Sequence, residues 1–434
     1  MTSPFEAARD HFLKGVALLE AGNNVAAEAA LQASLALLPG RPSTLVNLGA
    51  VRLRLGRPAE AITVLDEALA ADEQQADAWC HRALACSELG REGEALANLQ
   101  RAFALGCTLP SARQHQALVL NRLGRHAEAL AVLQALLLAE PAQAGAQLLL
   151  GQTLQTLHRL PEARYAYEAA VALLPRQPEA WMHLGLLLND QGDAPAAQQA
   201  LQRARQSGGD GALLAYFSAA VDDGPTPSSA PPQYVRALFD PYAEGFEQHL
   251  VDELRYCGHE AVVNAAAAWH SGPAALALDL GCGSGLCGAL LRTRARRVEG
   301  VDLSPTMVAQ ARAGGSYDAV HEADIVQHLL SRSDRVDVVV AADVFIYIGD
   351  LGPVFAAVAA VLAPGGVFAF TVEQEEGPAA YVLRRSLRYA HSEAGLRGSA
   401  AAHGWVVRQA RPLVLREEQR LPVAGLVLVL QRAG

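Results

Sequence analysis

Small and apolar residues recur with a period of 34 along the first half of this 434-residue chain. In each of six units a turn residue is followed five positions later by alanine, and a large apolar residue comes four positions after that. This spacing predicts two short amphipathic helices in each unit, because glycine ends the first helix and alanine lets the second approach its neighbour. The turn residues are Gly22, Gly56, Gly90, Gly124, His158 and Gly192; the alanines are Ala27, Ala61, Ala95, Ala129, Ala163 and Ala197; the apolar positions are Leu31, Leu65, Leu99, Leu133, Tyr167 and Leu201.

In the second half, short runs of apolar and β-branched residues alternate with stretches of helical spacing. This rhythm predicts βαβ units and a doubly wound, seven-stranded, mostly parallel sheet, so that the whole chain is of class α + α/β. In such sheets ligands bind beyond the carboxyl ends of the strands. The expected strands are Ala275–Leu280, Val298–Asp302, Ala319–Glu322, Val336–Ala342, Gly366–Val372, Trp405–Arg408 and Leu426–Leu430.

The 34-residue pattern resembles the tetratricopeptide repeat, with Trp79 and Trp181 at its aromatic position and Arg82 and Arg113 among its departures. The resemblance implies an α-solenoid of six repeats plus a capping helix over residues 1–221. The composition of residues 222–233, with four prolines and no apolar periodicity, predicts a linker. The resemblance also implies a peptide or protein partner in the concave groove. The alternative is that the array only orders the enzyme or makes a homo-oligomer.

Charge and composition exclude several classes of function. The net charge is −10, and neither half has the basic surplus that nucleic-acid binding needs. No apolar run approaches the roughly 20 residues of a membrane span, and the N-terminus lacks a secretion signal. The six cysteines show no metal-ligand or disulfide spacing, so we expect reduced thiols, no metal and a cytoplasmic location. The single lysine, Lys14, lies outside the second half, so lysine is excluded there as a base or nucleophile.

A glycine-rich loop and a series of acids follow the predicted strands. The first strand ends in LDLGCGSG, and Asp302, Asp324 and Asp343 come at or after the ends of the next three strands. Glycine lets the backbone turn sharply and approach a ligand closely. The segment GSGLCG also fits the GxGxxG pattern of dinucleotide dehydrogenases, so this class must be weighed.

Five stretches decide between these classes: LDLGCGSG, GVDLSPTMV, EADI, VVVAADVFIY and LAPGGVFAFTVE. Together they resemble class I S-adenosylmethionine-dependent methyltransferases over residues 273–434. The resemblance implies a Rossmann-like core, S-adenosylmethionine as cofactor and S-adenosylhomocysteine as product, within a domain over residues 234–434.

Cofactor contacts are implied by the same resemblance. Gly281, Cys282, Gly283 and Gly285 would cradle the methionine portion, and Asp279 would position its amino group. Asp302 would accept the ribose hydroxyls, Leu303 and Met307 would lie beside the adenosine, and Asp324 with the Ile325 backbone would meet the adenine; Asp343 would meet cofactor and acceptor. Asp302 and Asp324 could instead be turn acids or helix caps, and Met307 could be a core residue.

Upstream, the segment FDPYAEGFEQHL resembles one found in a bacterial group that joins tetratricopeptide repeats to a trans-aconitate methyltransferase-like domain. Tyr242 and Phe246 lie four apart in it and would fold over the cationic sulfonium as a lid, within a helical region over residues 234–272. The alternative is an amphipathic helix that packs these rings into a core.

The acceptor side is less specific. Asp343 and Tyr347 follow the fourth strand, and Arg388, Tyr389 and His391 lie between the fifth and sixth. Arg388, Tyr389 and His391 would bind an acidic substrate or act as a base, and the alternative for them is a solvated basic helix. The segment AADVFI lacks the Asn-Pro-Pro-aromatic signature of base and amide methyltransferases, which disfavours those acceptors.

Three functional hypotheses follow. The first is methylation of a peptide or protein recruited by the repeats. The second is O-methylation of a small carboxylic acid, with the repeats serving for oligomerisation or partner docking. The third is a scaffold without catalytic activity that keeps the methyltransferase fold for assembly.

Overall fold

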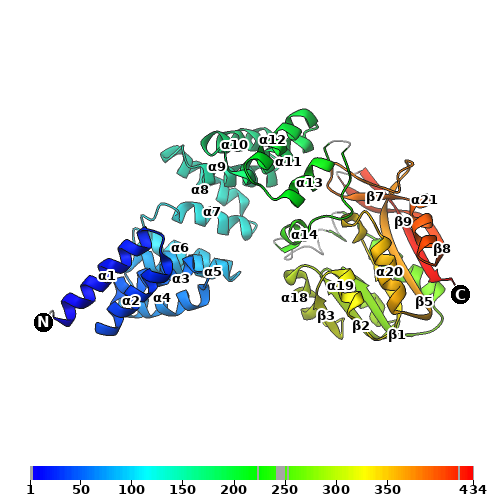
Figure 1. The fold of residues 1–434 in the computed structure, drawn as a ribbon, viewed down its shortest axis with the longest axis horizontal. Helices are drawn as coiled ribbons and strands as arrows, with labels where there is room; N and C mark the ends of the chain where they lie inside the picture. Colours follow the sequence, from blue (N-terminus) through cyan, green and yellow to red (C-terminus); the bar gives the residue numbers. More distant parts are fainter. Residues whose placement is uncertain (1–2, 222–223, 241–249, 252–253, 419–420, 434) are drawn as a thin grey trace. The chain divides into compact units, whose positions relative to one another are not determined.

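The computed structural model describes residues 3–221, 224–240, 250–251, 254–418 and 421–433. The chain divides into two compact units, Met1–Leu187 and Leu188–Gly434 (Figure 1). Among the described residues, no helix combines the length and hydropathy that crossing a membrane requires.

The first unit is a series of antiparallel helix pairs. Its turn glycines adopt the left-handed conformation, and His158, in the one slot without glycine, does so too with φ 56°. The six alanines of the pattern are fully buried, the last of them in the second unit. The helices are α1 (Pro4–Glu20), α2 (Asn24–Leu37), α3 (Pro42–Arg54), α4 (Pro58–Ala71), α5 (Ala76–Glu88), α6 (Glu92–Ala104), α7 (Ala112–Arg122), α8 (His126–Ala139), α9 (Ala144–Thr156), α10 (Leu160–Leu173) and α11 (Pro178–Asp190), whose last residues belong to the second unit.

Two departures from the repeat pattern are accommodated by polar and cationic contacts. Arg82 donates to Asp66 at 2.7 Å and to Asn98 at 3.1 Å. The Arg113 guanidinium lies 3.9 Å from the centroid of the Phe103 ring, within cation–π range. Both arginines therefore replace apolar packing with specific contacts.

The second unit contains a nine-stranded sheet in the order β3-β2-β1-β4-β5-β7-β6, with β9 pairing β5 and β8. Strands β1 to β5 are parallel, and β9 runs antiparallel to β5. The strands are β1 (Ala274–Leu280), β2 (Ala295–Asp302), β3 (Ala319–Glu322), β4 (Val336–Ala341), β5 (Leu362–Glu375), β6 (Tyr381–Leu383), β7 (Tyr389–Ser392), β8 (Trp405–Glu418) and β9 (Leu421–Arg432).

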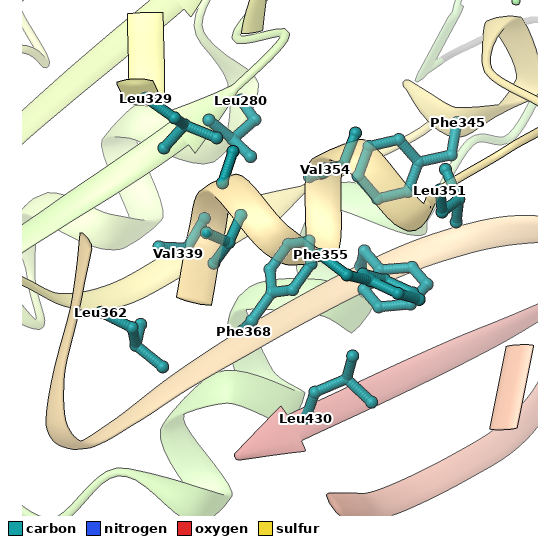
Figure 2. Packing of buried hydrophobic residues seen from close by; sticks show 14 of the residues in the cluster. Leu280, Leu329, Val339, Phe345, Leu351, Val354, Phe355, Leu362, Phe368 and Leu430 are labelled. Atoms are coloured by element: carbon teal, nitrogen blue, oxygen red, sulfur yellow. The ribbon is translucent and has the colours of Figure 1, made fainter. Parts of the chain in front are cut away.

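Helices flank the sheet, and aromatic packing fills the core beneath one of them. On α20, Val354 and Phe355 are buried with Phe345 and Phe368, and the Phe355 and Phe368 ring centroids are 6.3 Å apart (Figure 2). This packing fixes the segment that follows β4, which borders the site. The helices are α12 (Ala194–Gln206), α13 (Gly211–Ala219), α14 (Pro232–Phe239), α16 (Gly258–Trp269), α17 (Leu286–Arg292), α18 (Pro305–Ala313), α19 (Ile325–Leu330), α20 (Gly352–Val361) and α21 (Glu393–Ala402), and Phe345–Tyr347 forms the short 3-10 helix η3.

The sheet has two strands more than the seven that we predicted. The extra pair, β6 and β7, forms a hairpin where a basic helix was the alternative. Its turn is closed by hydrogen bonds from Arg384 N to Arg388 O and from Leu387 N to Arg384 O, and Leu387 has φ 59°. Strands of three and four residues are too short to give a periodic signal.

The segment that we predicted to be a linker is bound to this sheet. Ser228 O accepts hydrogen bonds from Gly349 N and Asp350 N, and Ala230 N donates to Tyr347 O. The Tyr389 hydroxyl donates to Pro227 O at 2.8 Å. The described part of this proline-rich segment is therefore a fixed part of the second unit.

The last repeat also contacts the β6–β7 turn. Asn189 Nδ2 donates to Arg385 O at 2.9 Å, and the hydroxyl of buried Tyr216, on α13, donates to Leu387 O at 2.5 Å. The end of the repeat array therefore supports the turn that precedes Arg388.

We expect Tyr216→Phe to loosen this turn, because the change leaves a carbonyl without its donor at a cost of about 1–3 kcal/mol. Amide hydrogen exchange in residues 381–392 should accelerate by roughly 5- to 150-fold if it proceeds by local opening. Tyr165→Phe, at a ring that is 74% exposed, is the control and should leave exchange there unchanged. Equal exchange in all three proteins would contradict a supporting role for Tyr216.

Candidate functional site

A cavity of about 550 Å³ lies at the carboxyl ends of β1, β2 and β4. It is lined by the loop after β1, the ends of β2 and β4, the starts of α18 and α19, and residues between 228 and 259. All of these belong to the second unit. Its position is where a doubly wound sheet binds its ligand.

The glycine loop forms one wall of the cavity. Gly281, Gly283 and Gly285 all have positive φ, and a Cβ on Gly281 would stand 2.5 Å from a Val344 methyl. Gly281, Cys282 and Gly283 line the cavity, whereas Gly285 caps α17 behind it. The Ser284 hydroxyl in the same loop is buried without a hydrogen-bond partner and also lines the cavity. The loop thus offers closely approaching backbone and one unsatisfied hydroxyl.

Asp302 ends β2 and fastens this loop. One carboxylate oxygen accepts from Gly283 N at 2.8 Å, and the other accepts from Ser304 N at 2.9 Å. Burial raises the pKa of Asp302, although these backbone donors act in the opposite direction. The residue therefore has a structural role as well as a place in the cavity wall.

Asp279 lies deeper, one residue before the end of β1, and is only 1% exposed. The Tyr317 hydroxyl donates to its carboxylate at 2.7 Å. Burial raises the pKa of Asp279 to about 7, and the Tyr317 hydrogen bond only partly offsets that. A carboxyl group in this state would gain from a cationic partner in the cavity.

The four residues predicted to lie near the adenosine all line the cavity: Leu303, Met307, Asp324 and Ile325. Met307 is buried, and Asp324 is exposed and caps α19 by accepting from Gln327 N at 3.0 Å. For Asp324 the capping and ligand-facing interpretations are therefore compatible.

The predicted lid residues Tyr242 and Phe246 lie outside the described residues. Phe239, from the same motif, lines the cavity, and its ring meets that of Tyr347 edge to face at 5.7 Å.

Asp343 lines the cavity but is already engaged. Arg416 donates to both of its carboxylate oxygens, at 2.9 and 3.0 Å, and the Asp343 backbone has φ 58°. Arg416 is 2% exposed and also pairs with Glu373 and Glu418. Sequence reasoning missed Arg416, because the strand that carries it was expected to end at Arg408.

Tyr347 and Arg388 are neighbours in the cavity wall. Burial raises the pKa of Tyr347 to about 12, although Arg388 acts to lower it. The hydroxyl is thus protonated at neutral pH and is a hydrogen-bond donor rather than a base. Arg388 forms an ion pair with Glu418.

Tyr389 and His391, which we predicted as acceptor-side residues, lie outside the cavity lining on β7. The Tyr389 hydroxyl donates to Pro227 O, and His391 Nε2 donates to Gly349 O at 3.0 Å. Burial lowers the pKa of His391 to about 4, so its ring is neutral at pH 7. The structure therefore gives both residues a packing role in place of the predicted one.

Tyr256 and His259 line the cavity and were missed from the sequence. Their rings stack with centroids 5.5 Å apart. They lie on either side of Gly258, the first residue of α16, and no recognisable motif in the neighbouring sequence indicates a binding site there.

Away from the cavity, Glu299, His321 and His328 bring potential metal-ligand atoms within 4.8 Å of one another. Arg332 donates to Glu299 at 2.6 Å and lies 3.2 Å from His328 Nε2. A guanidinium therefore already neutralises the carboxylate that a cation would need.

Comparison with known proteins supports both halves of this description. Residues 278–370 match the family described as "Methyltransferase domain". Residues 18–85, 76–105, 115–175 and 148–212 match families described as "Tetratricopeptide repeat". The two resemblances predicted from the sequence are confirmed.

Individual relatives are distant. The ubiquinone biosynthesis O-methyltransferase of Methylobacterium sp. (strain 4-46) is 29% identical over 94 residues, which span 21% of this chain and 38% of the relative. MamA (41-end) from Desulfovibrio magneticus RS-1 is 25% identical over 38% of this chain and 94% of its own, with a TM-score of 0.36. Magnesium protoporphyrin IX methyltransferase from Synechocystis PCC 6803, with bound SAH, is 17% identical over 46% of this chain and 99% of its own, with a TM-score of 0.37.

Proposed function

We propose that this tetratricopeptide-repeat-containing class I methyltransferase transfers the methyl group of S-adenosylmethionine to a peptide or protein that its repeats recruit. The observation that carries the proposal is the meeting of the glycine loop, Asp279, Asp302 and Asp324 around one cavity next to the end of the repeat array.

The residues present fit such a cofactor. Bound there, it would supply an electrophilic methyl group on a sulfonium. Asp279 would hold the amino group, since a buried carboxyl gains most from a cation. The loop around Gly283 would accept the methionine portion, and the Ser284 hydroxyl would gain a partner. Asp302 has lone pairs left to accept ribose hydroxyls after it has accepted Gly283 N and Ser304 N.

Recruitment is supported by the contacts of the last repeat. Asn189 and Tyr216 hold the turn that leads into Arg388, and Arg388 lines the cavity. These contacts tie residues of the second unit that belong to the end of the repeats to the turn before a cavity-lining arginine, and this link supports a role of the repeats on the acceptor side. Methyl transfer is an in-line displacement, so alignment of the acceptor and exclusion of water are the main demands on the protein.

A second candidate is O-methylation of a small carboxylic acid. It is favoured by one observation, the two guanidiniums of Arg388 and Arg416 in the cavity wall. A carboxylate acceptor needs no general base, because it has no proton to lose.

The pH dependence of cofactor binding tests the role of Asp279. Its carboxyl group is half protonated near pH 7, and an ammonium pairs only with the carboxylate, so binding should release a proton. We expect S-adenosylhomocysteine to bind about tenfold more weakly at pH 6 than at pH 8, as measured by calorimetry. Asp279→Asn should weaken binding at pH 8 and flatten this dependence. Equal affinity of the wild-type chain at both pH values would refute the assignment.

Asp302 is tested by substitution. Asp302→Asn should weaken S-adenosylhomocysteine binding by about 1.5–3 kcal/mol, because it removes the charge from hydrogen bonds to the ribose and one of the two acceptors that hold Gly283 N and Ser304 N. Glu322→Gln, at an exposed acid on the neighbouring strand that does not line the cavity, is the matched control. Comparable losses in both variants would point to a general effect of charge instead.

Recruitment is tested by removing residues 1–177. The deletion stops before α11, since a cut at residue 222 would also remove Asn189 and Tyr216. We expect S-adenosylhomocysteine affinity within twofold of the full chain, and a loss of at least tenfold in labelled methyl transfer to proteins of a host lysate. Undiminished transfer by residues 178–434 would sink the recruitment hypothesis.

A further inference from the structure

Five charged side chains from the ends of β4, β5, β7 and β8 meet at the cavity wall. Arg416 is at the centre: Nη1 donates to Asp343, Nη2 to Glu373, and Nε to Glu418 at 2.7 Å. Arg388 donates to Glu418 as well. Arg388 and Arg416 both line the cavity, and Glu418 bridges them.

The three carboxylates are not held equally. Asp343 accepts on both oxygens and its side chain is 17% exposed, and the side chain of Glu373 is 3% exposed and also pairs with Arg384. The Glu418 side chain is 34% exposed, and both guanidiniums contact the same oxygen, Oε1. Glu418 is therefore the carboxylate of this cluster that can leave with the least disruption.

Departure of Glu418 would leave two donors aimed at one point. Arg416 Nε and Arg388 Nη1 would both lack an acceptor there, with the protonated hydroxyl of Tyr347 beside Arg388. Two uncompensated guanidinium donors in a largely buried wall create a strong demand for another anion. The backbone at Arg388 would stay in place, because Asn189 and Tyr216 hold the carbonyls of the turn that precedes it.

We propose that Arg388 and Arg416 form a carboxylate-binding subsite for the acceptor, and that Glu418 occupies it as an internal stand-in until an acceptor carboxylate displaces it. This inference rests on the proposed function, because the subsite has a role only if the cavity performs methyl transfer. It specifies the class of acceptor as a molecule that bears a carboxylate, either an acidic peptide or a free polycarboxylic acid. Replacement of one carboxylate by another keeps the charge of the cluster constant, so the exchange costs little electrostatic energy.

The cluster also predicts selectivity. A cationic acceptor cannot replace Glu418 as the acceptor of these two guanidinium donors, so it gains nothing at this point of the wall. Lysine-rich peptides are therefore expected to be excluded, whereas acidic ones are expected to bind.

The test measures anion binding by calorimetry on the full chain saturated with S-adenosylhomocysteine. The probes are citrate, a hexapeptide of glutamate and a hexapeptide of lysine. Glu418→Ala should bind citrate or the glutamate peptide at least tenfold more tightly than the wild-type chain, and Glu418→Gln, which keeps the size of the side chain, should show the same direction. Adding Arg388→Met to Glu418→Ala should abolish that gain.

Arg397→Met is the matched control, since Arg397 is exposed and pairs with Glu393 on α21 away from the cluster. It should leave binding of all three probes unchanged. A gain with citrate alone identifies a small acid, and a gain with the glutamate peptide identifies a peptide; either supports the subsite.

The proposal is overturned if neither glutamate variant gains affinity for an anion, if the gain survives Arg388→Met, or if the lysine peptide binds best. Failure of the proposed function is separate: it would appear as absence of S-adenosylhomocysteine binding to the wild-type chain before any probe is added.

Discussion

The ion pairs of Arg416 are the interactions on which one wall of the cavity depends. Each of the three guanidinium nitrogens donates to a carboxylate near the end of a different strand: Asp343 after β4, Glu373 on β5 and Glu418 at the end of β8. Removing one partner of a buried ion pair typically costs about 3–5 kcal/mol, because it leaves a charge without water or a counterion. Arg416 therefore fixes the relative positions of the strand ends that border the cavity, and Asp343 is held in a left-handed conformation beside it.

This arrangement changes the chemistry expected of Asp343. A strand-end acid in this position is a candidate base when viewed from the sequence, but a carboxylate that accepts two hydrogen bonds from a guanidinium is poorly suited to take a proton. Tyr347 is protonated, and His391 is buried away from the cavity. The described side chains thus favour recognition and alignment over proton transfer, which agrees with an acceptor that arrives already ionised.

Most of the fold followed from local patterns, because the strands before the cavity are apolar runs ended by glycine or acid. The 34-residue period located the turn inside each helix pair of the first unit, including the left-handed His158. The residues that border the cavity at the ends of β1 and β2 were equally predictable, since the glycine loop and Asp302 are contiguous with their strands. The long-range ion pair between Arg416 and Asp343 could not be predicted from the sequence. The two residues are 73 positions apart, and no periodicity indicates an arginine on a buried strand face. The β6–β7 hairpin was not predicted, because contacts with Pro227 and Tyr216 hold it in place rather than a pattern in its own sequence.

The same contacts give the proline-rich segment and the last repeat a structural role in the second unit, beyond connecting two parts of the chain. Proline lacks a backbone donor, so a segment rich in it can be fixed by its carbonyls, as Pro227 O and Ser228 O are. By accepting from Tyr389 and from the backbone beyond η3, this segment is held where Ser228, Ser229 and Ala230 form part of the cavity wall. The turn at Leu387 is then held from both sides, by Tyr216 through its carbonyl and by the hairpin through its amide. The backbone of an arginine at the end of such a turn keeps its position when the counterion leaves, and an exchangeable anion site requires a fixed anchor of this kind.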